Sequence, residues 1–175
     1  MNEKLSMDAL GRMTPEAFKA AEKIPVVLLL ENIRSGLNVG SLFRSGDAFR
    51  LKGIFCIGYT PVPPHREVLK SALGATETVD WDHREDAVQL ITELKAAGFQ
   101  CMAIEQTSQS IELNNFIPDP TRPLALVLGN EVDGVSQAAI DACEGSIEIA
   151  QHGTKHSLNV AVCGGIVLYA LHSKL

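Results

Sequence analysis

IPVVLLLEN, residues 24–32, is the stretch that decides the fold. Its apolar side chains follow one another without the polar alternation of a half-exposed strand, so a strand here has both faces buried. Helical patterns separate this run from further apolar runs of strand length, at 53–59, 77–81, 99–105, 124–130 and 146–150. This order predicts an α/β fold, with a mainly parallel sheet and helices on both faces.

The segments between these strands have helical spacing. The segment 84–98 is predicted to form a helix that Gly98 ends. One face of this helix carries the apolar residues Ala87, Leu90, Ile91 and Leu94. We expect further helices at 38–50, within 63–74 and at 136–142. Pro15 can open a short helix over 16–22. Residues 1–23 are therefore predicted to form an N-terminal helical arm and residues 24–175 the main domain.

Composition places the chain among globular proteins, with 46% hydrophobic residues, 21% charged residues and a formal net charge of −6. This charge argues against binding nucleic acid over the whole surface, but it is compatible with a local basic patch. No apolar signal segment precedes residue 24, and the apolar run 160–171 is shorter than the ~20 residues of a membrane span, so we expect a cytoplasmic protein.

Several common sites have no signature in the sequence. Glycine-rich dinucleotide and phosphate loops are missing, as is the serine-hydrolase elbow. The four cysteines are far apart, so we expect reduced thiols rather than zinc ligands. His152 and His156 have a spacing of four, but Gly153 between them favours a loop. We expect no metal site.

Ligands of parallel sheets bind at the carboxyl ends of the strands, so polar residues just after the apolar runs are the candidates. After the first run, Asn38 begins a helix, where its amide can cap free N–H groups, and Arg44 follows six residues later. The pair is compatible with a helix cap and a solvent-reaching arginine as well as with a functional site.

Two further junctions carry polar residues. The run 124–130 ends in glycine, asparagine and Glu131, where Gly129 would let the backbone approach a ligand closely; the alternative is a turn before a helix. The run 146–150 leads through Lys155 and His156 to Ser157, a plausible N-cap of the terminal helix. Its free N–H groups would favour polar ligand atoms, although a capped core helix explains the same pattern.

Taken together and in this order, the three junctions resemble the motifs of the SPOUT superfamily, in particular the TrmH-like RNA ribose 2′-O-methyltransferases. Asn38 and Arg44 match the first motif, and Gly129–Glu131 match the second. Ser157–Val160 match the third, after an apolar strand and a glycine-containing loop. The resemblance spans about residues 25–172. It departs after residue 160, where small residues replace the serine and alanine that are frequent in the family.

The resemblance implies a C-terminal deep trefoil knot, which general topology rules disfavour. It also implies methyl transfer from S-adenosylmethionine to a ribose 2′-hydroxyl of tRNA or rRNA, without a metal. Arg44 would act on the hydroxyl, positioned together with the substrate by Asn38, Glu131, Ser157 and Asn159. The cofactor would bind to Gln106, Leu128, Gly129, Asn130, Ile149, Gln151 and Leu158. An inactive RNA-binding factor of the same fold and an RNA base methyltransferase are the alternatives.

The terminal helix is apolar on all sides and therefore needs cover on all sides. One side can pack on its own sheet, and the other on a second copy related by a two-fold axis. The resemblance also implies a homodimer, in which Arg44 can serve the neighbour's site. The candidates for an RNA-facing patch, which could equally be scattered solvated charges, are Arg34, Arg50, Lys52, His65, Arg66, Lys70 and Lys155.

Overall fold

A seven-stranded parallel sheet organises the computed structural model, which describes residues 2–6 and 8–175. The strand order is β3–β2–β1–β6–β4–β7–β5, and every neighbouring pair is parallel. The strands are β1 Ile24–Glu31, β2 Leu51–Ile57, β3 Trp81–Arg84, β4 Gln100–Ile104, β5 Ile111–Glu112, β6 Leu124–Leu128 and β7 Gly145–Glu148. The predicted α/β class and the parallel sheet are confirmed.

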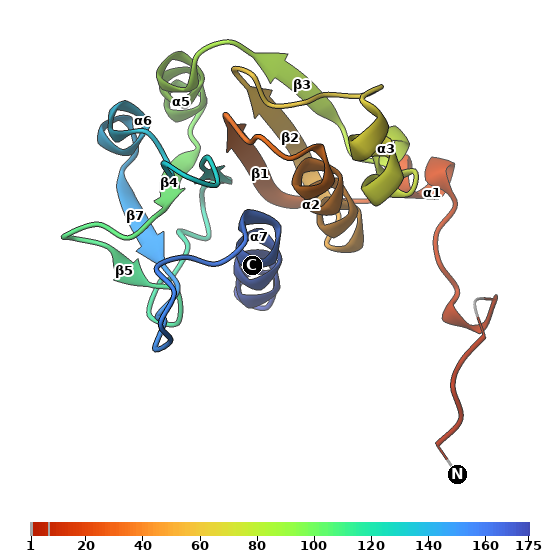
Figure 1. Cartoon of the computed structure of the whole chain (residues 1–175). Coiled ribbons are helices and arrows are strands. Elements are labelled where there is room, and N and C mark those ends of the chain that lie inside the picture. Colours follow the sequence, from red (N-terminus) through yellow and green to blue (C-terminus); the bar gives the residue numbers. More distant parts are fainter. Residues whose placement is uncertain (1, 7) are drawn as a thin grey trace.

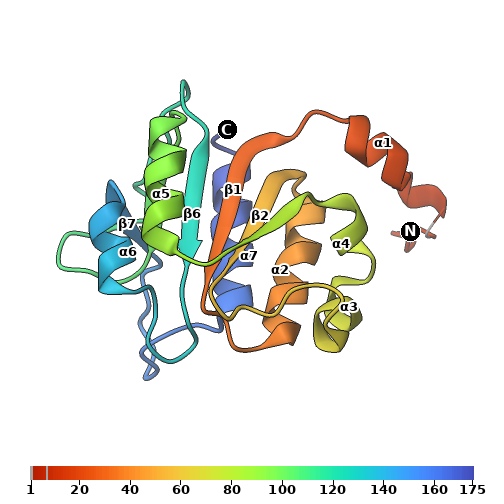
Figure 2. The same cartoon turned by 90° about the horizontal axis from the view of Figure 1, so that it is seen from above.

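Helices cover both faces of the sheet (Figure 1). They are α1 Pro15–Ala20, α2 Gly36–Ala48, α3 Arg66–Ala72, α4 Ala75–Thr78, α5 Ala87–Ala96, α6 Gln137–Ala142 and α7 Val160–His172, with a 3-10 turn at Asp8–Leu10. The helices α2, α3 and α7 lie on one face, and α5 and α6 lie on the other (Figure 2).

The uninterrupted apolar sequence of β1 follows from this two-sided cover. Leu28 and Leu30 pack into the core under α2 and α7, whereas Val27 and Leu29 pack into the core under α5. Successive side chains of a strand point to opposite faces, so each core takes every second residue. The predicted buried face of α5 is also confirmed, because Ala87, Leu90, Ile91 and Leu94 are its buried residues.

Among the described residues of the N-terminal segment, those of α1 reach the core. Thr14 caps this helix by accepting a hydrogen bond from the Ala17 N–H, and Phe18 is buried in the same core as α2 and α7. The described residues before α1 extend away from the sheet (Figure 1). The helix predicted for 16–22 is present and ends at Ala20. The division of the chain at residue 23 stays a prediction.

Two local predictions differ from the structure. The strand predicted for 77–81 is wrong: Glu77 and Thr78 are helical, and β3 begins at Trp81. Gly74, with φ +89°, starts a single helical turn here, and the apolar Val79 that suggested a strand is buried against the helical layer. The sequence also gave no sign of β5, since this exposed edge strand of two residues has no apolar run.

The terminal helix α7 is covered on one side by its own chain. Val167 and Leu168 are buried, and Gly164 lies so close to α2 that a Cβ atom there would be 2.4 Å from the Leu42 Cδ2 atom. On the opposite side Tyr169 is 74% exposed and Val162 is also exposed. Within residues 2–6 and 8–175, no helix has the length and apolar composition of a membrane span.

Candidate functional site

A cavity of about 420 Å³ lies at the carboxyl ends of β4, β6 and β7. Glu131 and Ser157 line it, and so does the terminal-helix residue Cys163. Its lining also contains all seven residues that the sequence assigned to a cofactor: Gln106, Leu128, Gly129, Asn130, Ile149, Gln151 and Leu158. Loops far apart in sequence therefore meet at one polar cavity, at the edge where parallel sheets bind ligands.

Gly129 is required by the shape of the loop beneath this cavity. A Cβ atom at Gly129 would lie 2.1 Å from the Gly134 carbonyl carbon and from the Val135 nitrogen, both of them backbone atoms. The loop closes through two hydrogen bonds between the backbones of Asn130 and Gly134, of 3.0 and 2.9 Å. Glycine is therefore needed so that the loop can fold back against the end of β6.

Asn130 holds this loop in place with its side chain. Its Nδ2 donates to the Asn32 carbonyl oxygen at 2.8 Å and to the Tyr59 hydroxyl at 2.7 Å. Its Oδ1 accepts from the N–H groups of Val132 and Asp133. An amide has two donors and two acceptor positions, so this buried side chain has none left for a ligand. Any contact of Asn130 with a cofactor is thus restricted to its backbone.

Glu131 ties the second motif to the first. Its carboxylate accepts from the N–H groups of Arg34 and Ser35, at 2.8 and 3.0 Å, and from Asn38 Nδ2 at 2.8 Å. Partial burial raises the pKa of Glu131, but the hydrogen bonds from Arg34, Asn38 and Ser35 outweigh this effect and hold the pKa below its ordinary value. The Asn38 Oδ1 atom in turn accepts from Asn159 Nδ2 at 3.1 Å.

Two predicted helix caps are wrong. Ser35, and not Asn38, caps α2 by accepting from the Asn38 N–H, which frees the Asn38 side chain to bind Glu131. Asn159, and not Ser157, caps α7 by accepting from the Ala161 and Val162 N–H groups. These N–H groups are therefore satisfied within the protein, and Ser157 is an exposed residue at the cavity wall.

Glu105 is a site residue that sequence analysis missed. Its carboxylate accepts from the Gln106 N–H at 2.8 Å and from the Val135 N–H at 3.0 Å, and so connects the end of β4 to the loop folded over Gly129. Gln106 continues this connection by donating to the His156 carbonyl oxygen at 2.9 Å. A carboxylate directly after an apolar strand was the available signal.

Arg44 does not reach this cavity within its own chain. It is exposed on α2 and lines a separate shallow hollow with Ser45, Lys70 and other residues of α2 and α3.

The candidates for an RNA-facing basic patch do not all lie on one side of the molecule. Arg34 lies at the carboxyl end of β1, whereas Arg50 lies between α2 and β2, at the amino end of the strands. Among the described residues, no three His, Cys, Asp or Glu side chains gather as a metal site.

A parallel sheet with a cavity at its carboxyl edge is the arrangement in which α/β proteins generally bind small ligands. Residues 25–169 match the model of the SpoU rRNA Methylase family. The match covers most of the chain, and the chain belongs to this family.

Two relatives indicate the level of similarity. A Staphylococcus aureus (strain MSSA476) protein named for the TrmH family is 30% identical over 156 residues, which are 89% of this chain and 62% of that protein. The tRNA (guanosine(18)-2′-O)-methyltransferase of Aquifex aeolicus is 28% identical over 82% of this chain and 67% of its own length. This chain thus spans about three-fifths to two-thirds of these relatives.

Solved structures share the fold. The crystal structure of the A. aeolicus TrmH/SpoU tRNA modifying enzyme has a TM-score of 0.79 and 26% identity, and the match covers 91% of this chain and 79% of that one. The AdoMet-bound rRNA methyltransferase from Sinorhizobium meliloti has a TM-score of 0.80 at 24% identity, over 94% of this chain and 62% of that one.

Proposed function

We propose that this protein transfers a methyl group from S-adenosylmethionine to a ribose 2′-hydroxyl of tRNA or rRNA. The observation that carries the proposal is the hydrogen-bonded series Glu131–Asn38–Asn159, which joins one residue from each of the three motifs beside the cavity. Polar side chains that are held together in this way are pre-organised for chemistry. The similarity to the tRNA (guanosine(18)-2′-O)-methyltransferase of Aquifex aeolicus supports the choice of reaction.

The cavity fits the cofactor. Gly129 lets the following loop fold back and form part of the cavity wall, where any side chain at this position would collide with the Gly134 backbone. Its wall combines apolar residues such as Leu128 and Ile149 with polar side chains from Gln106 and Gln151. Cofactor sites combine apolar surface with polar groups that fix the orientation of the ligand. When bound, S-adenosylmethionine supplies an activated methyl group, so the protein has only to position and activate the acceptor.

Arg44 is the residue that we assign to the acceptor. A ribose hydroxyl is a weak nucleophile at neutral pH. As its oxygen bonds to the methyl carbon, the carbon–sulfur bond breaks, S-adenosylhomocysteine leaves, and the hydroxyl proton passes to water. Arginine is a poor proton acceptor, so the guanidinium serves to stabilise the developing alkoxide. Asn38, held by Glu131 and Asn159, fixes the end of the helix that carries Arg44.

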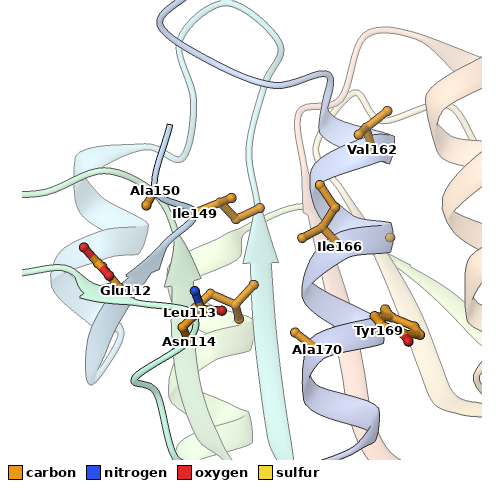
Figure 3. A pocket seen from close by; sticks show the side chains of 10 residues that line it. Glu112, Leu113, Asn114, Ile149, Ala150, Val162, Ile166, Tyr169 and Ala170 are labelled. Carbon is orange, nitrogen blue, oxygen red and sulfur yellow. The ribbon is translucent and has the colours of Figure 1, made fainter. Parts of the chain in front are cut away.

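Because Arg44 lies outside the cavity of its own chain, the proposal includes a homodimer in which it serves the partner's cavity. An apolar groove of about 610 Å³ runs between α7 and the β5–β7 edge. In it Ile166 and Ala170 lie across from Ile149 and Leu113 (Figure 3). A second copy of this helix, related by a two-fold axis, would present the same apolar surface to cover it.

The dimer is tested by placing a charge on the exposed face of α7. Ile166→Asp is expected to give monomers by light scattering and to abolish methyl transfer. The matched control is Val88→Asp on α5, whose exposure of 37% is close to the 39% of Ile166 but which lies on the other face of the sheet. A monomeric wild-type protein, or an active monomeric Ile166→Asp variant, would contradict the proposal.

Two further properties belong to the proposal. The likeness to the solved TrmH/SpoU structure supports a trefoil knot at the C-terminus, and a crystal structure traced through 105–123 and 149–172 tests the threading. A cytoplasmic location is tested by cell fractionation.

The activity is tested in two stages. Calorimetry should detect S-adenosylmethionine binding without added metal, and mapping of ribose methylation in total RNA from a deletion strain should identify a missing 2′-O-methyl group. Arg44→Ala should keep cofactor binding and lose methyl transfer. Loss of a base methyl group instead would favour the base methyltransferase, and RNA binding with no methyl transfer would favour the inactive factor.

A further inference from the structure

Tyr59 is an exposed aromatic residue that the site does not use. It follows β2 at the carboxyl edge of the sheet and is 62% exposed. Its hydroxyl nevertheless accepts a hydrogen bond of 2.7 Å from Nδ2 of the buried Asn130, within the Gly-Asn-Glu motif. A side chain that leaves most of its ring in water while its tip is bound contributes little hydrophobic stabilisation to the fold.

The backbone that carries this ring is fixed on both sides. The Tyr59 N–H donates to the Asn32 side chain at 3.3 Å. The next residue, Thr60, is buried, and its hydroxyl lies 2.8 Å from the carbonyl oxygens of Leu30 and Ile57. Because both the backbone and the hydroxyl are anchored, the ring has little freedom left to lose when a ligand covers it.

Two basic residues, Arg34 and His65, lie at the same edge of the sheet as Tyr59. Arg34 follows the Asn32 turn, and its N–H binds Glu131, the neighbour of Asn130. The His65 Nδ1 atom is 2.9 Å from the position that a Cβ atom would occupy at Gly36, so His65 also lies at the start of α2. Aromatic faces next to cations are typical of surfaces that bind single-stranded nucleic acid, because bases stack on the rings and cations neutralise the phosphates.

We propose that Tyr59 is a base-stacking residue, on which an unpaired nucleobase of the RNA substrate rests beside the methylation site. The inference rests on the proposed RNA methyltransferase function and deepens it, since it makes a single-stranded nucleotide part of the substrate. The hydrogen bond from Asn130 sets the position of the ring relative to the cofactor cavity. Tyr59 is a positioning residue and takes no part in the chemistry.

The test compares two oligonucleotides of equal charge with three forms of the full-length protein. Binding of a 12-nucleotide oligoadenylate and of its abasic counterpart is measured by fluorescence anisotropy, with S-adenosylhomocysteine present. Aromatic stacking is worth about 5- to 150-fold in affinity. Wild-type protein should prefer the oligoadenylate by a factor in this range. Tyr59→Ala should lose that preference, and Tyr59→Phe should retain it because it keeps the ring.

Each outcome decides between stacking and a structural role. If Tyr59→Ala binds both oligonucleotides more weakly by the same factor, or if wild-type protein shows no preference for bases, the stacking proposal is overturned. If Tyr59 serves only to support Asn130, Tyr59→Ala should keep the base preference of the wild-type protein, while Tyr59→Phe weakens S-adenosylmethionine binding in calorimetry. Failure of the proposed function is recognised separately, as absence of S-adenosylmethionine binding to wild-type protein.

Discussion

Replacement of Glu131 by glutamine tests the hydrogen-bonded core of the site. The carboxylate accepts three hydrogen bonds, one at Oε2 from the Arg34 N–H and two at Oε1 from Ser35 and Asn38. Glutamine has nearly the same shape but carries an NH₂ group in place of one oxygen. If its remaining oxygen keeps the Ser35 and Asn38 bonds, its NH₂ group faces the Arg34 N–H, so two donors oppose each other.

The magnitude follows from these three bonds. Hydrogen bonds to a charged group contribute about 1.5–3 kcal/mol each, and neutral ones about 0.5–1.5 kcal/mol. One bond is lost and two become neutral, but Glu131 is partly exposed, and water replaces part of the loss. We expect the free energy of unfolding to fall by about 2–3 kcal/mol, which lowers the melting temperature by about 4–12 °C for a chain of this size.

The assay is urea unfolding of wild-type and variant protein between pH 3 and pH 8. The folded-state pKa of Glu131 lies below its ordinary value of 4.5, so the carboxylate stabilises the fold fully above pH 4.5. This contribution is lost as the pH falls through the lowered pKa. The difference between wild type and Glu131→Gln should therefore be constant at neutral pH and shrink under acid conditions.

Asp133→Asn is the control, because this exposed carboxylate is in the same loop and its side chain forms no hydrogen bond with the described residues. Equal stability of the two variants, or a Glu131→Gln difference that does not change with pH, would refute the reasoning. Methyl transfer should fall as well, since the hydrogen bond from Asn38 to residue 131 becomes neutral and weaker.

Three further predictions concern the cavity and the terminal helix. Gly129→Ala should abolish S-adenosylmethionine binding in calorimetry, because its Cβ would collide with backbone atoms, whereas Gly153→Ala has open space and should bind normally. Asn159→Ala should lower the free energy of unfolding in urea by about 1 kcal/mol, the usual loss of an N-cap, and Ser157→Ala should leave it unchanged. Burial raises the pKa of the Cys163 thiol to about 11. Because only the thiolate reacts, alkylation of Cys163 should be slow at pH 8 and become faster as the pH approaches 11. Because Cys163 lines the cavity, S-adenosylmethionine should slow the reaction further, which peptide mass spectrometry can follow.

Much of the site was predictable, because its residues stand directly after apolar strands. The carboxyl ends of parallel strands share one edge, so the ends of the runs 99–105, 124–130 and 146–150 had to meet there. The roles within the site were less accessible. An asparagine near a helix start is a cap or a site residue according to its neighbours, and only three-dimensional contacts distinguish Asn38, which binds Glu131, from Asn159, which caps α7.

By itself the sequence determined the class of fold and the location of the cavity. A strand with an unbroken apolar run, such as residues 26–30, needs a layer of helices on each face, and this pattern is read from local sequence alone. Tertiary structure alone decided the rest. Gly129 is a necessity only because Gly134 folds back on it, Tyr59 is anchored only because Asn130 lies within reach, and Arg44 faces away from the cavity only because α2 packs as it does against the sheet. Each of these depends on the path of a loop, on contacts between residues distant in sequence or on the packing of a whole helix, which periodicity does not encode.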